Sequence, residues 1–368
     1  RWASTSATAS EAVLAAVRPT GSGPVHHHPA LKLQGGEVLA GACTAYRTLG
    51  RLAEDGRNAV LVLHGYTTGP AMLDAGANVA EGSWSDLVGP GKAIDSTCHF
   101  VICPNMLGSS YGSTGPGSVN PATGKPYGID FPCLTVRDIV DAQKDLLDAL
   151  GVQYLAAVVG PSLGGYQALQ WAVRHPSMVA RVVAAVSAPW NPPGAVQSAS
   201  LREQLAAQPS WNAGHPAPGS MVDWLTALRV ATLTRYGVDD DLRARLPDPA
   251  ERAAEVRRLA REWAEGFDPN ALLTLAMAAE SFDLRGQLSA IRAPLLMVMS
   301  RSDQVFSPAL AREFAPLLDA AGVPWSYVEL DSDKGHLASG ADAALWSDIL
   351  RRFMGTAPEA WVSWGLQP

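Results

Sequence analysis

The sequence predicts an α/β fold, in which a mostly parallel, doubly wound sheet is interrupted by an inserted helical cap. Short apolar strands alternate with helical stretches, which is typical of βαβ units. The strands are continuously apolar, as expected where helices cover both faces of a parallel sheet. The alternation stops between about 189 and 288, a stretch that carries helical patterns and no good strand.

The expected elements follow from apolar runs and helical spacing along the chain. The predicted strands are Thr44–Thr48, Ala59–Leu63, Phe100–Cys103, Leu155–Val159, Val182–Val186, Leu295–Ser300 and Ser326–Leu330. The predicted helices of the sheet domain are Thr135–Leu150, Tyr166–Arg174, Pro308–Ala321 and Ala343–Phe353, and those of the cap are Ala250–Glu265 and Ala271–Ser281. The domain organisation is therefore an N-terminal extension (1–30), a core (31–188 and 289–368) and a cap (189–288).

Composition limits the classes of function. Of the 368 residues, 47% are apolar and 17% are charged, so the chain can bury a large core. The net charge of −7 argues against nucleic acid or an anionic membrane as a partner. No run is long and apolar enough to span a bilayer, and we expect a cytoplasmic protein. The segment 1–21 has no clear signal-peptide core, which leaves a processed leader open.

The four cysteines show no C-x-x-C pair and no metal-ligand spacing with histidine. The sequence therefore predicts buried free thiols rather than a disulfide, no metal site and no bound cofactor.

A serine stands at the junction of a strand and a helix. Gly160-Pro161-Ser162-Leu163-Gly164 fits the pattern G-x-S-x-G, which forces a sharp turn and exposes the serine hydroxyl. A Cβ at Gly160 or Gly164 would collide with the neighbouring strand or helix. An ordinary glycine-rich turn is the alternative, so Ser162 needs partners before it can be called a nucleophile.

A serine hydroxyl needs an imidazole to accept its proton, and the imidazole needs a carboxylate to fix its tautomer. Asp303 follows the predicted strand Leu295–Ser300, and His336 lies in a glycine-bearing loop after the next strand. Both positions lie beyond the carboxyl ends of strands, where parallel sheets place functional loops. The sequence thus predicts Ser162, Asp303 and His336 as a catalytic triad.

Other candidates fit these roles less well. Asp331 and Asp333 lie close to His336 in sequence but are expected to be loop carboxylates. The tract from His26 to His28 is expected to be exposed and polar. His64 precedes a glycine turn and is expected to be a structural residue beneath the site.

An oxyanion hole needs two backbone N–H groups. One is that of Leu163, directly after the nucleophile, at the positive end of the following helix. The residue after His64-Gly65 normally directs its amide into such a site, which makes Tyr66 the second candidate.

From about residue 31 to residue 353, the chain resembles the homoserine O-acetyltransferase family of α/β-hydrolases. The matching passages are LVGPGKAIDSTCHFVICPNMLGSSYGSTGPGSVNPATGKPYGIDFP, TVRDIVDAQKDLLDALGV, GPSLGGYQALQWA, FDPNALLTLAMAAESFDL and IRAPLLMVMSRSDQVFSP. The resemblance implies the α/β-hydrolase fold, a triad on Ser162, Asp303 and His336, and oxyanion amides on Tyr66 and Leu163. It also implies double displacement through an acyl-serine, a helical cap, and a homodimer formed through cap helices.

The chain departs from the family where the acceptor binds. Family members typically read G-H-D after the last strand, and the resemblance assigns that aspartate to the amino group of homoserine. Here the residue is Leu337, and an apolar side chain cannot pair an ammonium. The family's H-A-L-T-G stretch is H-G-Y-T-T in this chain. Arg229 is the candidate for the family's carboxylate-binding cap arginine; the alignment around LTALRVATLTRYG shifts by a residue, so the sequence leaves this correspondence open.

Two enzymatic functions share this machinery and differ in the group that takes the acyl chain. If water takes the acyl group, the protein is a carboxylic ester hydrolase. Leu337 favours this function, because water, unlike homoserine, has no ammonium group that the site must pair. An alcohol makes it an O-acyltransferase, with acetyl-CoA as the acyl donor. A binding protein on an inactive hydrolase scaffold is the third hypothesis, and the complete triad argues against it. In either enzymatic case the partner is a small molecule.

Overall fold

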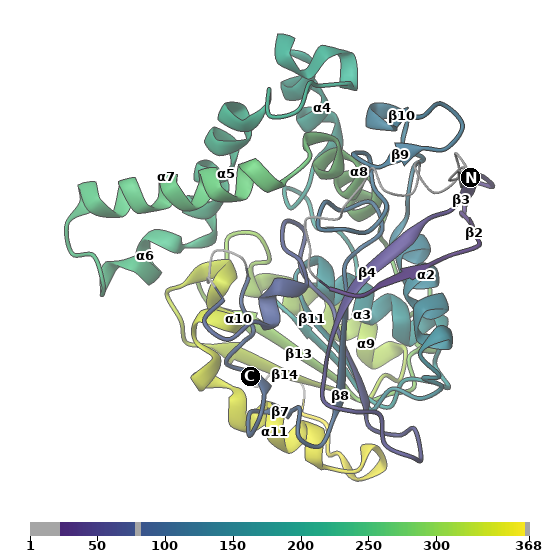
Figure 1. Ribbon diagram of the computed structural model, residues 1–368. Coiled ribbons are helices and arrows are strands. Elements are labelled where there is room, and N and C mark those ends of the chain that lie inside the picture. The colour runs from purple at the N-terminus through teal and green to yellow at the C-terminus, as the bar shows by residue number, and fades with distance from the viewer. Residues whose placement is uncertain (1–22, 78–81, 365–368) are drawn as a thin grey trace, which may run out of the picture.

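The computed structural model describes residues 23–77 and 82–364, and its centre is an eight-stranded sheet (Figure 1). The spatial order of the strands is β1-β4-β8-β5-β11-β12-β13-β14. Their bounds are β1 (Val25–His27), β4 (Cys43–Leu49), β5 (Ala59–Val62), β8 (Phe100–Pro104), β11 (Ala157–Pro161), β12 (Val182–Ala185), β13 (Leu295–Ser300) and β14 (Trp325–Leu330). Short pairs lie outside it: β2 (Ala30–Lys32) with β3 (Val38–Ala40), β6 (Val88–Gly89) with β7 (Ile94–Asp95), and β9 (Val119–Asn120) with β10 (Lys125–Pro126).

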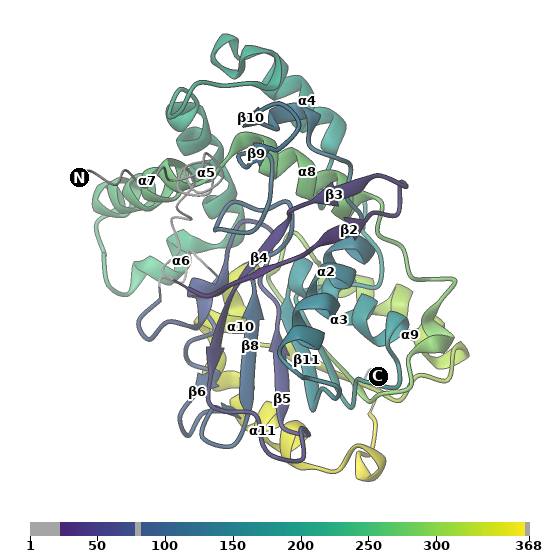
Figure 2. The ribbon, with the colours of Figure 1, turned by 45° about the vertical axis from the view of Figure 1, so that its right-hand side comes forward.

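The six strands from β8 to β14 in this order are all parallel, while β4 and β1 pair antiparallel at one edge (Figure 2). The carboxyl ends of the parallel strands therefore meet at one edge of the sheet, where loops from different strands come together. The α/β-hydrolase arrangement expected from the sequence is confirmed.

Helices cover both faces of the sheet. The helices of the sheet domain are α2 (Val136–Ala149), α3 (Leu163–Arg174), α9 (Ala311–Ala320), α10 (Ala338–Ala341) and α11 (Ser347–Gly355). Alternate side chains of β5 enter different clusters: Leu61 packs with residues of α2, α3 and α9, and Val60 packs with residues of α11. This alternation explains why the central strands are apolar at every position.

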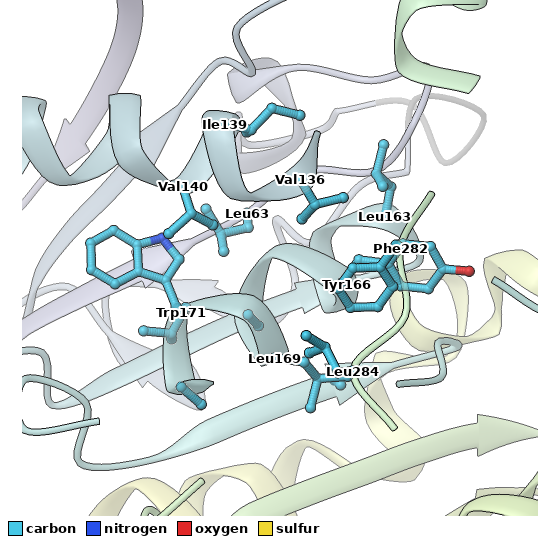
Figure 3. Close-up of a cluster of buried hydrophobic side chains, with 14 of the residues drawn as sticks. Leu63, Val136, Ile139, Val140, Leu163, Tyr166, Leu169, Trp171, Phe282 and Leu284 are labelled. Atoms are coloured by element: carbon cyan, nitrogen blue, oxygen red, sulfur yellow. The ribbon is translucent and has the colours of Figure 1, made fainter. Parts of the chain in front are cut away.

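The cluster beneath the site joins α2, α3 and the sheet (Figure 3). It includes Trp171, whose indole N–H donates to the side chain of Gln143 at 2.8 Å. Tyr166 stacks on Phe282, with ring centroids 4.2 Å apart, and this contact ties α3 to the end of the cap. The helix that follows Ser162 is therefore anchored along its length.

Five helices lie between β12 and β13 and form a cap beyond the carboxyl ends of the strands (Figure 1). They are α4 (Ser198–Ala206), α5 (Val222–Tyr236), α6 (Val238–Arg243), α7 (Pro249–Gly266) and α8 (Pro269–Glu280). The segments that enter and leave the cap are hydrogen bonded: Asn191 N–H donates to Phe282, and Leu284 N–H donates to Pro189. No helix in the two described ranges has the length and apolar character that a membrane crossing requires.

Several details differ from the sequence-based expectations. The cap helices α4, α5 and α6 were not predicted, and the predicted helix Ala343–Phe353 begins as an α-helix only at Ser347. The fourth predicted strand begins two residues late, at Ala157, because Leu155 makes only an isolated bridge to Val179. Part of the predicted N-terminal extension belongs to the sheet, since β1 pairs with β4; residues 1–22 of that extension lie outside the described residues. His28 was expected to be exposed, but it is buried against Thr44 of β4. The four cysteines are free, as predicted, but the expectation that they are buried holds only for Cys103, since Cys98 and Cys133 are exposed.

Candidate active site

Ser162 lies at a sharp turn between β11 and α3. Its backbone angles are φ 54° and ψ −122°, a strained conformation for a residue with a side chain. The turn is possible because glycine precedes and follows it: a Cβ on Gly160 would lie 2.6 Å from the Leu63 carbonyl oxygen, and one on Gly164 would lie 2.1 Å from it. The Ser162 N–H donates to the carbonyl of Ala185 at 2.8 Å, which fixes the turn to β12. The strand-turn-helix context expected of G-x-S-x-G is present.

Asp303 and His336 are hydrogen bonded, with Oδ2 and Nδ1 2.8 Å apart. The other carboxylate oxygen, Oδ1, accepts the backbone N–H groups of Val305 at 2.7 Å and Phe306 at 3.1 Å. The Asp303 side chain is fully buried, so its three partners replace the water it has lost. The carboxylate is held in one orientation and directs the Nε2 atom of His336 away from it.

Ser162 and His336 line the same cavity, which has a volume of about 40 Å³. Its apolar wall includes Trp84, Tyr236 and Leu337. A second cavity, of about 140 Å³, is also lined by Ser162 and has Asn191 and Arg235 on its wall. Both cavities are also lined by Tyr66 and Tyr236. The serine thus lines a narrow cavity and a wider one, and the wider one has polar groups on an otherwise mainly apolar wall.

The two candidate oxyanion amides come from different elements. Leu163 is the first residue of α3, so its N–H has no acceptor within the helix. Tyr66 follows β5, and its hydroxyl donates to the carbonyl of Leu272 in α8 at 2.6 Å, which links the loop to the cap. Burial raises the pKa of the Tyr66 phenol, and this keeps it protonated as a donor.

The competing candidates lie elsewhere. Asp331 and Asp333 form exposed ion pairs with Arg301, at 2.7 and 2.6 Å. His64 is fully buried: its Nδ1 bonds the Gly65 carbonyl at 2.9 Å, and its Nε2 accepts the Met106 N–H at 3.0 Å. Burial lowers the pKa of His64 to about 4, so the ring is neutral at pH 7. These contacts fit the structural role expected from the sequence.

Leu337 packs against the cap. It is buried and belongs to an apolar cluster with Leu233 of α5 and Val238 of α6. The cap thereby closes over the residue next to His336, at the wall of the small cavity.

Arg229 of α5 is buried behind the loop that carries Tyr66. Its Nη1 donates to the Thr67 hydroxyl at 2.6 Å, and its guanidinium lies 4.8 Å from the ring centroid of Trp263. The arginine is therefore next to the site but supports the loop rather than forming part of either cavity wall described above.

Two functional neighbours of His336 were missed from the sequence. The ring of Tyr236 lies 4.8 Å from the imidazole centroid, and that of Phe306 lies 5.7 Å away and nearly parallel. Tyr236 ends the cap helix α5, a hundred residues before His336, and no spacing in the sequence relates the two. Phe306 could have been noticed, because it lies three residues after the predicted acid.

The chain matches the model of the alpha/beta hydrolase fold family over residues 58–341. It is 37% identical over 354 residues to a homoserine O-acetyltransferase of Symbiobacterium thermophilum, with 88% of this chain and 91% of that protein covered. It is 36% identical to a homoserine O-succinyltransferase of Leptothrix cholodnii, with 88% and 93% covered.

Solved structures of two kinds are similar to the chain. One is that of a homoserine O-acetyltransferase from Bacillus anthracis, with a TM-score of 0.82, 26% identity, and coverage of 92% of this chain and 98% of that one. Another is that of esterase E22, with a TM-score of 0.80, 26% identity, and coverage of 90% and 99%. Transferases and an esterase thus share this architecture.

Proposed function

The chain belongs to the homoserine O-acetyltransferase family of alpha/beta hydrolases, and from this we propose that it transfers a short acyl group to a small hydroxyl acceptor through an ester on Ser162. The observation that carries the proposal is the Asp303–His336 hydrogen bond beside a cavity that Ser162 also lines. Curated relatives at 36–37% identity, which are O-acyltransferases, support it.

In the first half-reaction, Ser162 Oγ attacks the carbonyl carbon of the donor, a thioester such as acetyl-CoA. His336 Nε2 takes the serine proton, while Asp303 holds the Nδ1–H and stabilises the imidazolium. The N–H groups of Tyr66 and Leu163 bind the oxyanion. The proton on His336 then passes to the leaving thiolate, and the acyl-serine remains.

In the second half-reaction, the acceptor hydroxyl replaces the thiol. His336 Nε2 removes its proton, the new oxygen attacks the acyl carbon, and Ser162 recovers its proton as the tetrahedral intermediate collapses. The narrow cavity of about 40 Å³ suits a short acyl chain, and the wider one of about 140 Å³ suits a small acceptor. We therefore assign the acyl group to the narrower cavity.

Ester hydrolysis is the second candidate, and one observation favours it. Leu337 presents an apolar surface beside His336 where an acceptor ammonium would need a carboxylate. The sequence alone ranks water first for this reason. The curated relatives favour an alcohol, and we rank transfer above hydrolysis on their account.

The test is product partitioning. The enzyme is incubated with acetyl-CoA and millimolar homoserine, and O-acetylhomoserine and free acetate are quantified by mass spectrometry. We expect the O-acetyl product to exceed acetate, and Ser162→Ala to form neither. Acetate as the main product, at a rate that homoserine leaves unchanged, would reject transfer to homoserine in favour of hydrolysis.

A variant at Leu337 separates the two acceptors further. Leu337→Asp places a carboxylate beside the imidazole, where it can pair an ammonium, and should raise the share of O-acetylhomoserine. Leu337→Asn is the matched control, because it has the same shape and no charge. Melting temperatures check that both variants are folded. If the two variants then gave the same ratio of O-acetylhomoserine to acetate, the residue at position 337 would not bind the amino group of homoserine.

A further inference from the structure

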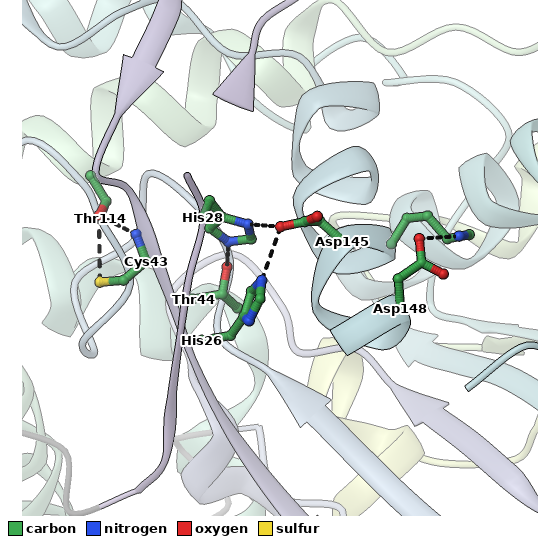
Figure 4. Close-up of polar contacts among 8 residues, drawn as sticks. His26, His28, Cys43, Thr44, Thr114, Asp145 and Asp148 are labelled. Atoms are coloured by element: carbon green, nitrogen blue, oxygen red, sulfur yellow. Dashed lines mark hydrogen bonds and ion pairs between the residues drawn. The ribbon is translucent and has the colours of Figure 1, made fainter. Parts of the chain in front are cut away.

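Two histidines and an aspartate meet between β1 and α2 (Figure 4). His26 and His28 are alternate residues near the end of β1 and face the same side. Asp145 comes from α2, more than a hundred residues later. Its Oδ2 atom lies 2.9 Å from Nε2 of His26 and 2.6 Å from Nδ1 of His28. Three potential ligand atoms therefore converge on one point.

The surroundings hold these side chains in position. The His28 side chain is fully buried, and its second nitrogen, Nε2, is 2.8 Å from the hydroxyl of Thr44. The Asp145 side chain is 45% exposed and that of His26 is 18% exposed, so the cluster is open to water on one side. When a histidine binds a metal, its other ring nitrogen usually has a hydrogen-bond partner that holds the ring in place. Thr44 is such a partner for His28.

We propose that His26, His28 and Asp145 form a site for a zinc-type divalent cation, with Nε2, Nδ1 and Oδ2 as ligands and water in the open position. Two imidazoles and a carboxylate fit zinc and its late first-row neighbours, whereas magnesium and calcium prefer oxygen ligands. The three atoms all lie within 4.8 Å of one another. Ligand bonds of about 2.0–2.2 Å require the half-exposed Asp145 to shift outward and the partly exposed His26 ring to move toward His28, which is buried and stays in place.

The proton arrangement can adapt to such an ion. A neutral imidazole bonds the carboxylate through its N–H; with a metal on that nitrogen, the proton must move to the other one. For His28 the other nitrogen faces the Thr44 hydroxyl, which both donates and accepts. His28 can therefore change tautomer without losing a hydrogen bond.

The ion would join the outermost strand to a helix of the core. β1 lies at the edge of the sheet and pairs over three residues with β4. A cation held by both β1 and α2 binds only where the two are docked, so it stabilises the folded state. None of the three residues lines the cavities beside Ser162, so we expect a structural effect rather than a catalytic one. The sequence misses the site because Asp145 has no fixed spacing from the histidines.

The test uses the full chain without a polyhistidine tag, stripped with a chelator. Binding of zinc chloride is measured by calorimetry, binding of cobalt by visible absorption, and the thermal midpoint with and without zinc. We expect one zinc per chain and a rise in the midpoint. Asp145→Asn, which preserves shape, and His26→Gln should each weaken binding by about tenfold or more.

The matched control is His27→Gln, which removes an exposed histidine from the same tract and should bind zinc as the wild type does. No uptake of zinc by the wild type would overturn the proposal. Wild-type affinity in both Asp145→Asn and His26→Gln would also overturn it, because the ion would then be held elsewhere, for example at an exposed cysteine.

Discussion

Asp303 makes the contacts that fix the catalytic imidazole. Its two oxygens accept one imidazole N–H and two backbone N–H groups, and none of these bonds depends on the other carboxylates nearby. Asp303→Asn should keep the fold but leave His336 in the wrong tautomer, which lowers the rate by about 10⁴ on the precedent of serine proteases. Steady-state kinetics with a chromogenic acetate ester measure this.

Asp331→Asn is the matched control for that change. Asp331 is exposed, and among the described residues its ion pair is with Arg301, so its loss should leave the rate near that of the wild type. A larger loss in Asp331→Asn than in Asp303→Asn would show that the acid has been assigned to the wrong residue.

His64 predicts a dependence of stability on pH. Its pKa is about 4 in the folded state, because of burial, against 6.5 as the ordinary value. Between these values the unfolded state binds the proton and the folded state does not, so the free energy of unfolding falls as the pH falls from about 6.5 to about 4. The slope from this group is at most about 1.4 kcal/mol per pH unit.

Urea unfolding at pH 7 and pH 5 checks this prediction. His64→Gln retains a donor and an acceptor but cannot be protonated, so its stability should change less between the two pH values than that of the wild type. Equal changes in the two proteins would mean that other groups carry the acid sensitivity.

At the scale of elements, the turn into α3 depends on the missing side chain of Gly164. The atoms that a Cβ would meet are the Leu63 carbonyl and, at 3.1 Å, the His64 carbonyl oxygen, and backbone atoms cannot move aside cheaply. Gly164→Ala should therefore lower the free energy of unfolding by about 1–3 kcal/mol or more, and impair activity. Chemical denaturation measures the loss.

Gly266, the last residue of α7, offers a matched control for this substitution. No atom lies within 4 Å of the Cβ that Gly266→Ala would add, and alanine favours helix. Its stability should equal or exceed that of the wild type. If the two glycine variants were equally stable, the turn would not be as tightly packed as these distances indicate.

The sequence predicts the elements of the sheet well and those of its margins poorly. Buried parallel strands such as β13 consist of unbroken apolar runs, so composition alone identifies them. β1 has three residues, two of them histidine, and is recognisable only through its pairing with β4. In the cap, α5 carries apolar residues around its whole circumference, because it packs on α7 and on the core, and its periodicity is weak.

The residues of the site also fall into those that the sequence predicts and those that it does not. Ser162, Asp303 and His336 each follow a recognisable strand, and their order along the chain indicates their roles. Tyr236 and the cluster at Asp145 depend on contacts between distant segments, which neither spacing nor composition records.

At the scale of the whole molecule, the family resemblance predicts a homodimer that forms through the cap helices. The exposed face of α7 carries ion pairs such as those of Arg258 with Glu255 and Glu262, which suit a polar interface or a solvated surface. Light scattering at micromolar concentration should give twice the chain mass of 38.7 kDa. A mass that stays at the value of one chain across a tenfold concentration range would contradict the dimer.

The cap leaves the core and returns to it at one place, because Asn191 bonds Phe282 and Leu284 bonds Pro189. If the intervening residues were removed, the two cut ends would already be in contact, and a short peptide could close the gap at small entropic cost. The sheet is therefore insensitive to the length of what is inserted there. In terms of recombination, residues 190–283 are an exchangeable segment with crossover points at its two ends. A foreign cap grafted there would have to replace the contacts that Leu272 makes with Tyr66 and Arg229 makes with Thr67.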